Sequence, residues 1–177
     1  ENTIFRGNTA SKSGGAVYAD TKDTKCIITD CDFDSNTAAD GTGGALRAGN
    51  NTLLTVTGGN FTGNKATDGG GAVDVSGTGI ISSVKMYDNS VINSTSRGGG
   101  AIFVQSGKKL NLSNSTIYNN SRYEANGSIL PCDIYNAGVA ANLTLSGITS
   151  ENDQCFVYQS GKLWYVDSDE TSLVEAQ

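Results

Sequence analysis

The sequence predicts an all-β protein that folds as a single parallel β-helix of about six three-strand coils. Three observations carry this prediction. Two short motifs recur with a period near 28 residues, each period holds three short apolar segments, and Gly, Asn, Asp and Ser separate these segments. A pattern of this kind is typical of three strands and three turns per coil.

The first motif is F-x-x-N, whose apolar residue we expect to face the core and to stack on its counterpart one coil away. Full or weakened copies begin at Phe5, Phe33, Phe61, Met86 and Ile117, and a degenerate sixth begins at Ile148. Successive copies lie 28, 28, 25, 31 and 31 residues apart. A coil whose loops vary in length accommodates such spacing better than a helical solenoid does.

The second motif is G-G-A followed by an aliphatic residue, beginning at Gly14, Gly43, Gly70 and Gly99. Alternation along a strand predicts that Val73 and Val75 face inward while Asp74 faces outward. The same frame places the second glycine of each copy beside a corner with little room. In the last two repeats, Cys132 and Cys155 replace this glycine.

Composition restricts the function classes. The 177 residues include 23 Gly and 1 Pro, which favours many tight corners over a flexible linker. There is no His, so the commonest general base and transition-metal ligand is missing. A net charge of −6 argues against a nucleic-acid partner. No apolar run is long enough to span a membrane.

The asparagines of F-x-x-N are expected to form a structural column at one corner of the helix. Asparagine tolerates turn geometry, and stacked amides can hydrogen-bond between coils. The column would contain Asn8, Asn36, Asn64, Asn89 and Asn120.

The pairing of F-x-x-N with G-G-A-[ILV] resembles the repeats of the polymorphic outer-membrane protein family. The resemblance extends from residue 4 to about residue 135 and weakens over the last two repeats. It implies a right-handed parallel β-helix with a surface role, often adhesive, and it brings no catalytic residues. The right hand also agrees with the crossover rule for parallel strands.

The four cysteines are predicted to form two disulfides. Cys132 and Cys155 occupy the same coil position one coil apart, within the separation a disulfide accepts. Cys26 and Cys31 lie around one corner and are expected to pair with each other. Four buried free thiols are the alternative, and a zinc site is disfavoured by the spacing. Two disulfides would indicate an oxidising compartment.

Eight N-x-[S/T] sequons predict N-glycosylation, and no column asparagine is the acceptor residue of one, so we expect outward or loop positions. Unused sequons in a Ser/Thr/Asn-rich bacterial surface protein are the alternative. The sequons begin at Asn50, Asn60, Asn93, Asn111, Asn114, Asn119, Asn126 and Asn142.

No catalytic or metal site is expected. The series Asp30, Asp32 and Asp34 lacks the glycine and glutamate of an EF-hand, so a solvated acidic edge is favoured over loose Ca²⁺ binding. An ice-binding face would need a flat ladder of threonines on successive coils, and Thr55 and Thr57 have no such ladder around them.

The outward column after G-G-A is the candidate for sugar contact or subunit packing. It holds no acid beside Asp74, so a surface salt bridge of Asp74 with Arg47 is expected rather than a carbohydrate-cleaving cluster. The column contains Tyr18, Arg47, Asp74, Phe103, Tyr135 and Tyr158.

The domain prediction is a β-helix over residues 1–166 and an acidic, extended C-terminal tail over 167–177. The segment Gly161–Val166 is interpreted as a final coil or cap. No cap is visible at the N-terminal end, which suggests either preceding coils in a longer chain or end-to-end self-association into a filament.

Together these features predict an extracellular or cell-surface structural glycoprotein, a β-helix subunit of a fibre, filament or coat, without enzymatic activity. An adhesin-type binding module is the alternative, and a carbohydrate lyase or hydrolase is the weakest reading. No cofactor is expected beyond covalent N-glycans and weakly bound Ca²⁺.

Overall fold

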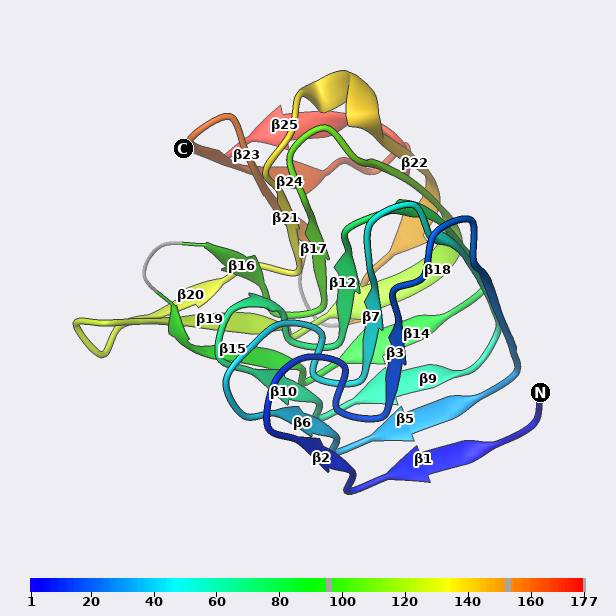
Figure 1. Cartoon of the computed structure of the whole chain (residues 1–177). Helices are drawn as coiled ribbons and strands as arrows, with labels where there is room; N and C mark the ends of the chain where they lie inside the picture. Colours follow the sequence, from blue (N-terminus) through cyan, green and yellow to red (C-terminus); the bar gives the residue numbers. More distant parts are fainter. Residues whose placement is uncertain (95–96, 152–153, 177) are drawn as a thin grey trace.

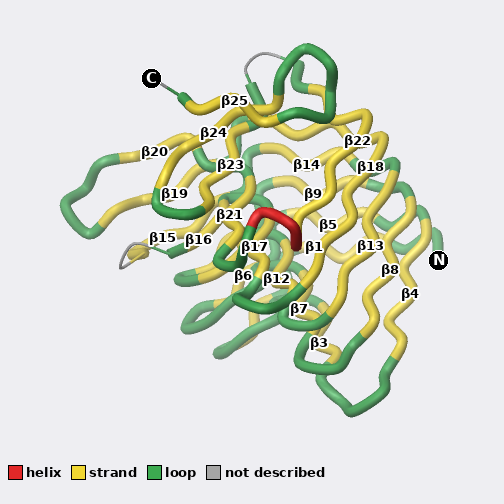
Figure 2. Tube along the Cα trace, turned by 90° about the horizontal axis from the view of Figure 1, so that it is seen from above, coloured by secondary structure: helices red, strands yellow, loops and turns green. Residues whose placement is uncertain are grey.

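The computed structural model describes residues 1–94, 97–151 and 154–176, and it is a right-handed parallel β-helix (Figure 1). From β1 (Ile4–Arg6) through β3 (Val17–Ala19) towards β4 (Lys25–Thr29) the chain runs clockwise in Figure 1, and Figure 2 shows the later coils farther from that viewer, which confirms the predicted hand. The six motif copies give about five turns, because an antiparallel cap follows the last copy in place of another coil.

The largest sheet contains two walls of the helix. The F-x-x-N wall is formed by β1 (Ile4–Arg6), β5 (Asp32–Asp34), β9 (Asn60–Thr62) and β14 (Lys85–Tyr87). The second wall is formed by β4 (Lys25–Thr29), β8 (Leu53–Thr57) and β13 (Thr78–Ser82). Strand β18 (Lys109–Tyr118) is long enough to pair with both walls, and β22 (Leu143–Thr149) pairs with it.

A second sheet of short strands continues from the F-x-x-N wall. Its order is β2 (Thr9–Ala10), β6 (Thr37–Ala38), β10 (Lys65–Ala66), β15 (Ser90–Ser94), β19 (Ser121–Glu124) and β20 (Ile129–Pro131). Strand β20 runs antiparallel to β19, so these two form a hairpin that projects from the body of the helix (Figure 1).

The third sheet follows the G-G-A motif. Its parallel strands are β3 (Val17–Ala19), β7 (Leu46–Ala48), β12 (Val73–Val75), β17 (Ile102–Val104), β21 (Ile134–Asn136) and β23 (Phe156–Gln159). The two-residue strands β11 (Gly69–Gly70) and β16 (Gly98–Gly99) pair nearby, and the 3₁₀ helix η1 (Ala140–Asn142) precedes β22.

The core is a thin column of stacked side chains, as the alternation predicts. The rings of Phe5 and Phe33 are 4.8 Å apart and those of Phe33 and Phe61 4.6 Å apart, and both pairs lie 9° from parallel. Met86 and Ile117 continue this stack in register and are fully buried. Offset aromatic stacks of this kind add to the free energy of burial.

The second glycine of each G-G-A copy is required by the close approach of adjacent coils, as expected. A Cβ atom on Gly44 would lie 2.0 Å from the carbonyl oxygen of Gly71, and one on Gly71 would lie 2.1 Å from that of Gly100. Backbone atoms on both sides leave no direction in which a side chain could relax.

The C-terminal end is closed by antiparallel pairing, which confirms the cap expected at Gly161–Val166. Strand β24 (Lys162–Val166) pairs with β23, and β25 (Leu173–Glu175) pairs with β24. The extended tail predicted from residue 167 is therefore wrong in conformation: its residues form a turn and a strand of the cap, because Leu173 packs against the core.

Candidate functional surfaces

The predicted asparagine column forms a continuous hydrogen-bonded ladder. The Nδ2 atom of Asn36 donates to Oδ1 of Asn64 (2.9 Å), and that of Asn64 donates to Oδ1 of Asn89 (2.9 Å). The same step links Asn8 to Asn36 and Asn89 to Asn120. Each buried amide also donates to a backbone carbonyl of the previous coil, so its hydrogen-bonding capacity is used within the chain.

The ladder ends on Asp133, a residue that the motif pattern does not identify. Its Oδ1 atom accepts from the backbone N–H (3.2 Å) and Nδ2 (2.7 Å) of Asn120, and its Oδ2 atom accepts from the backbone N–H of Phe156 (2.7 Å). Glu151, the fourth residue of the degenerate copy that begins at Ile148, forms an exposed ion pair with Lys85 (2.7 Å) and takes no part in the ladder. A carboxylate suits this end because only donors converge on it.

The strained position of this corner is the residue before each column asparagine. Gly7, Ser35, Gly63, Asp88 and Asn119 have φ between 56° and 64°. The asparagines of the column therefore stabilise the corner through side-chain hydrogen bonds, while the preceding residue adopts the left-handed backbone.

The outward column after G-G-A is partly covered, so its reading as an exposed surface is wrong. Tyr18 is 53% exposed, whereas Asp74 is 0% and Phe103 3% exposed. The connecting loops fold over this side of the sheet: a Cβ atom on Gly69 would lie 2.6 Å from the Thr42 side chain and 3.1 Å from Oδ2 of Asp74.

The expected salt bridge between Arg47 and Asp74 is also wrong. Arg47 donates to the hydroxyl of Ser13 in a covering loop (2.9 Å), and Asp74 accepts from the hydroxyl of Ser76 (2.5 Å). Burial raises the pKa of Asp74, and hydrogen bonds and the Arg47 charge offset this in part. A carboxyl buried in this way cannot reach a polysaccharide chain in solvent.

The four cysteines are free thiols in the structure, so neither predicted disulfide is supported. The predicted alignment is confirmed, because Ile134 pairs with Val157 and places Cys132 and Cys155 at equivalent positions of adjacent coils. Both thiols are buried, and burial raises the pKa of Cys132 to about 12. Cys31 donates to the carbonyl oxygen of Thr29 (3.2 Å) instead of pairing with Cys26.

The sequons lie on the surface as predicted, whereas the buried column is spared. Asn142 is half-buried, and the side chain of Asn93 lies outside the described part of the chain. The exposed sequon asparagines are Asn50, Asn60, Asn111, Asn114, Asn119 and Asn126. Exposure is a condition for glycosylation, so occupancy of these sites stays a prediction.

The aspartates on β5 form a hydrogen bond and an ion pair with side chains of the adjacent coils. Asp32 accepts from Nδ2 of Asn60 (2.8 Å), and Asp34 pairs with Arg6 (2.8 Å). Across the described residues, no group of three or more acidic or cysteine side chains is placed to hold a metal ion. Loose Ca²⁺ binding at Asp30, Asp32 and Asp34 stays a prediction.

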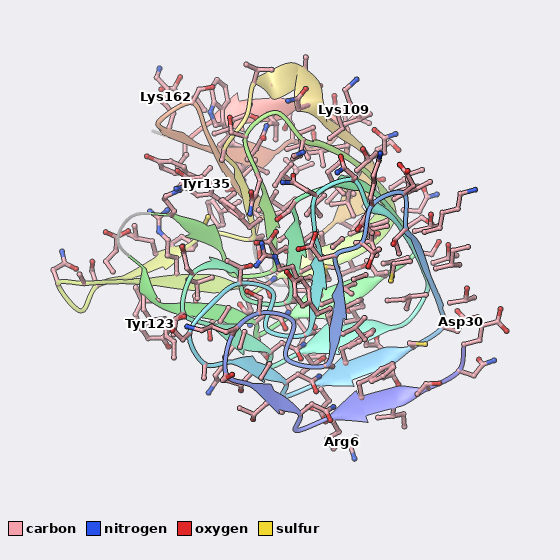
Figure 3. All side chains as sticks on the ribbon, viewed as in Figure 1. Arg6, Asp30, Lys109, Tyr123, Tyr135 and Lys162 are labelled. Atoms are coloured by element: carbon pink, nitrogen blue, oxygen red, sulfur yellow. The ribbon has the colours of Figure 1, made fainter. Side chains whose placement is uncertain are left out.

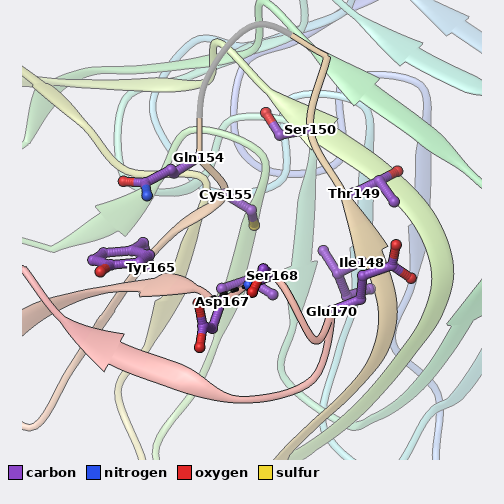
Figure 4. Close-up of a pocket in the computed structure, with 10 residues that line it drawn as sticks. Ile148, Thr149, Ser150, Gln154, Cys155, Tyr165, Asp167, Ser168 and Glu170 are labelled. Atoms are coloured by element: carbon purple, nitrogen blue, oxygen red, sulfur yellow. Dashed lines mark hydrogen bonds between the residues drawn. The ribbon is translucent and has the colours of Figure 1, made fainter.

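Among the hollows of the described surface, two are lined by carboxylates together with other polar side chains. One of about 380 Å³ lies beneath the C-terminal cap, where Asp167 and Glu170 point in different directions and Cys155 faces the space between them (Figure 4). A smaller groove of about 190 Å³ on the F-x-x-N wall is lined by Arg6, Asp32, Phe33, Asp34, Asn60, Thr62 and Tyr87.

In the parts of the chain that the structure describes, no helix is long and apolar enough to cross a membrane.

Comparison with known proteins supports the repeat assignment. The family model described as the Chlamydia polymorphic membrane protein (Chlamydia_PMP) repeat matches residues 2–20, which contain the first copies of both motifs. No curated protein and no solved structure matches the chain. The first coil of this β-helix thus carries a repeat of the polymorphic membrane protein type.

Proposed function

We propose that this chain is a structural β-helix module of an extracellular or cell-surface protein, built into a fibre, filament or coat and modified by N-glycans. The observation that carries the proposal is the ladder from Asn8 to Asp133, which locks each coil to the next through buried hydrogen bonds. A scaffold stabilised along its whole length is suited to bear load or to act as a spacer.

The surface supports the same role. The exposed sequons would carry glycans on several walls of the helix. The match to the Chlamydia polymorphic membrane protein repeat favours a surface location. The buried state of Asp74 and the divergent carboxylates of the cap argue against a carbohydrate-cleaving activity.

Self-association is part of the proposal. Strands β1 to β4 lie at the edges of their sheets, where backbone groups can pair with a further coil of the same chain or of another copy. The other end carries the antiparallel cap, so stacked copies would join unlike ends and generate a filament.

Electron microscopy of the native material, with an antibody against this chain, tests the proposal. We expect labelled polymers or a continuous surface layer, with glycan masses on peptides that contain the exposed sequons. Labelling confined to the cell interior, or unmodified monodisperse protein released from the native source, would refute it.

An adhesin role is the second candidate, favoured by the groove on the F-x-x-N wall. Asp32 keeps its Oδ2 atom and Asn60 its Oδ1 atom without a partner, and Tyr87 forms one side, a combination that suits a sugar hydroxyl and ring. Binding of a saccharide by the isolated protein, lost in Tyr87→Ala and retained in Tyr123→Ala, would favour this role over a purely structural one.

A further inference from the structure

The outer face of β4, β8, β13, β18 and β22 carries two parallel rows of uncharged side chains, one per coil. Register pairing aligns them step by step over five successive coils. The hydroxyl row contains Thr29, Thr57, Ser82, Ser113 and Ser146, and the mixed row contains Ile27, Thr55, Ile80, Asn111 and Thr144.

Thr57 stands in a ladder of hydroxyls and not of threonines: its neighbours in the row are Thr29 on one side and Ser82 on the other. The ladder escapes a search for repeated threonine because serine continues it from Ser82 onward. Unequal coil lengths hide it as well, since only the strand register shows which residues are neighbours.

The two rows form a regular grid. Adjacent parallel strands are about 4.8 Å apart, and residues two apart on one strand are separated by about 6.6 Å. The pairing of these strands shows no shift of register over the two rows, and Figure 2 shows β4, β8, β13 and β18 side by side.

The grid is held rigidly from beneath. The inward residues of the same strands are packed in the core, with Leu54, Val56 and Ile81 fully buried. Threonine and isoleucine have restricted χ1 rotamers, so their methyl groups and hydroxyls are presented in few orientations.

The walls of the helix differ in charge. The F-x-x-N wall carries ion pairs such as Arg6 with Asp34 and Lys85 with Glu151. The ten side chains of the two rows carry no charge. Charges flank the two rows on both sides: Lys25 and Lys109 stand in the next row at one rim, which Lys109 marks in Figure 3, and Asp30 follows Thr29 at the other, with its carboxylate beside Gly58.

We propose that this uncharged wall binds ice. Water oxygens on a prism face of hexagonal ice form a rectangular grid with nearly the same two repeats as these rows. Hydroxyls can hydrogen-bond to water at the grid points, and the methyl groups between them favour ordered water. Charged groups would hold their own hydration shells, so their absence from the rows allows the surface water to join the lattice.

Ice binding requires that Asn111, whose sequon lies on this face, carries no glycan, in contrast to the exposed sequons on the other walls, so the experiment uses the full chain produced without glycans. We expect a measurable gap between the melting and freezing points of small ice crystals, shaped crystals, and enrichment of the protein in slowly grown ice. Thr57→Arg should abolish all three effects, because the exposed arginine would stand in the middle of the grid.

Thr9→Arg is the matched control, since it places the same residue at an exposed position of β2, in a different sheet. It should retain full ice activity, and both variants should show the wild-type circular dichroism and melting curve. Wild-type protein without effect on ice, or equal loss in both folded variants, would overturn the proposal. A dimer broken by Thr57→Arg, without any effect on ice, would assign the wall to self-association and also overturn it.

Discussion

Replacing Asn64 by alanine should lower the free energy of unfolding far more than replacing Asn8, which lies at the exposed end of the ladder. Oδ1 of Asn64 accepts from the backbone N–H (3.0 Å) and Nδ2 (2.9 Å) of Asn36. Its Nδ2 atom donates to Oδ1 of Asn89 (2.9 Å) and to the carbonyl oxygen of Phe33 (2.9 Å). The residue is 0% exposed, so water cannot replace the lost partners.

The expected magnitude follows from these four hydrogen bonds. At about 1 kcal/mol of net stabilisation each, their loss lowers the free energy of unfolding by roughly 4 kcal/mol. Buried donors and acceptors left without partners can add about 1–3 kcal/mol each. A domain of ordinary stability has roughly 5–15 kcal/mol, so the variant should lie close to the limit of folding.

Asn8→Ala is the control for the same chemistry at the exposed end of the ladder. It removes a single side-chain hydrogen bond, from Nδ2 of Asn8 to Oδ1 of Asn36 (2.8 Å), and should cost about 0.5–1 kcal/mol. Urea denaturation followed by circular dichroism measures both variants. Equal, small losses for Asn64→Ala and Asn8→Ala would refute the reasoning that the buried ladder stabilises the coils.

Three further substitutions and one modification test other parts of the structure. Asp133→Asn should lower the free energy of unfolding by about 1–3 kcal/mol, because an amide nitrogen would replace one of two acceptors; urea denaturation measures this. Gly71→Ala should destabilise by more than about 3 kcal/mol, seen as a large fall in melting temperature, since its Cβ atom would meet backbone on two sides. Burial raises the folded-state pKa of Asp74 above 3.8, so the free energy of unfolding falls as the pH rises from 3.8 through the folded-state pKa. Asp74→Asn should remove this fall, and denaturation at pH 4 and pH 7 checks it. Iodoacetamide should modify Cys26 slowly in the folded protein and the other thiols only after denaturation, as mass spectrometry would show; no modification in denaturant without reductant would mean that disulfides are present.

The features that sequence predicted well are those fixed by a local rule. Alternation along a strand placed Val73 and Val75 in the core, and repetition of F-x-x-N placed Phe33 and Phe61 in one stack. Both depend on neighbours within a few residues or on an equivalent residue one coil away. A regular solenoid makes such local rules sufficient for most of its core.

The features that sequence missed depend on loops and on strand register. Asp74 occupies an outward position of its strand, yet the connecting segments of two coils, which contain Thr42 and Gly69, cover it. Nothing in the alternation of a strand reports what folds over its outer face. The hydroxyl row through Thr57 and Ser82 was missed for a related reason, because spacings of 25 to 33 residues between neighbours in the row conceal which side chains are adjacent.

The end of the asparagine ladder shows how two sequence patterns combine at one place. Asp133 stands in the position of the G-G-A alanine, because the backbone N–H of Ala101 donates to its carbonyl oxygen as that of Ala72 donates to Ala101. In the preceding coils this position is a buried alanine beside the corner that holds the column. An aspartate at this position supplies acceptors to Asn120, so the ladder can end there without a further F-x-x-N copy. Ile148 pairs with Ser115 and not with Ile117, so Glu151 does not stand at the column position; it pairs with Lys85 on the surface, and Asp133 ends the column.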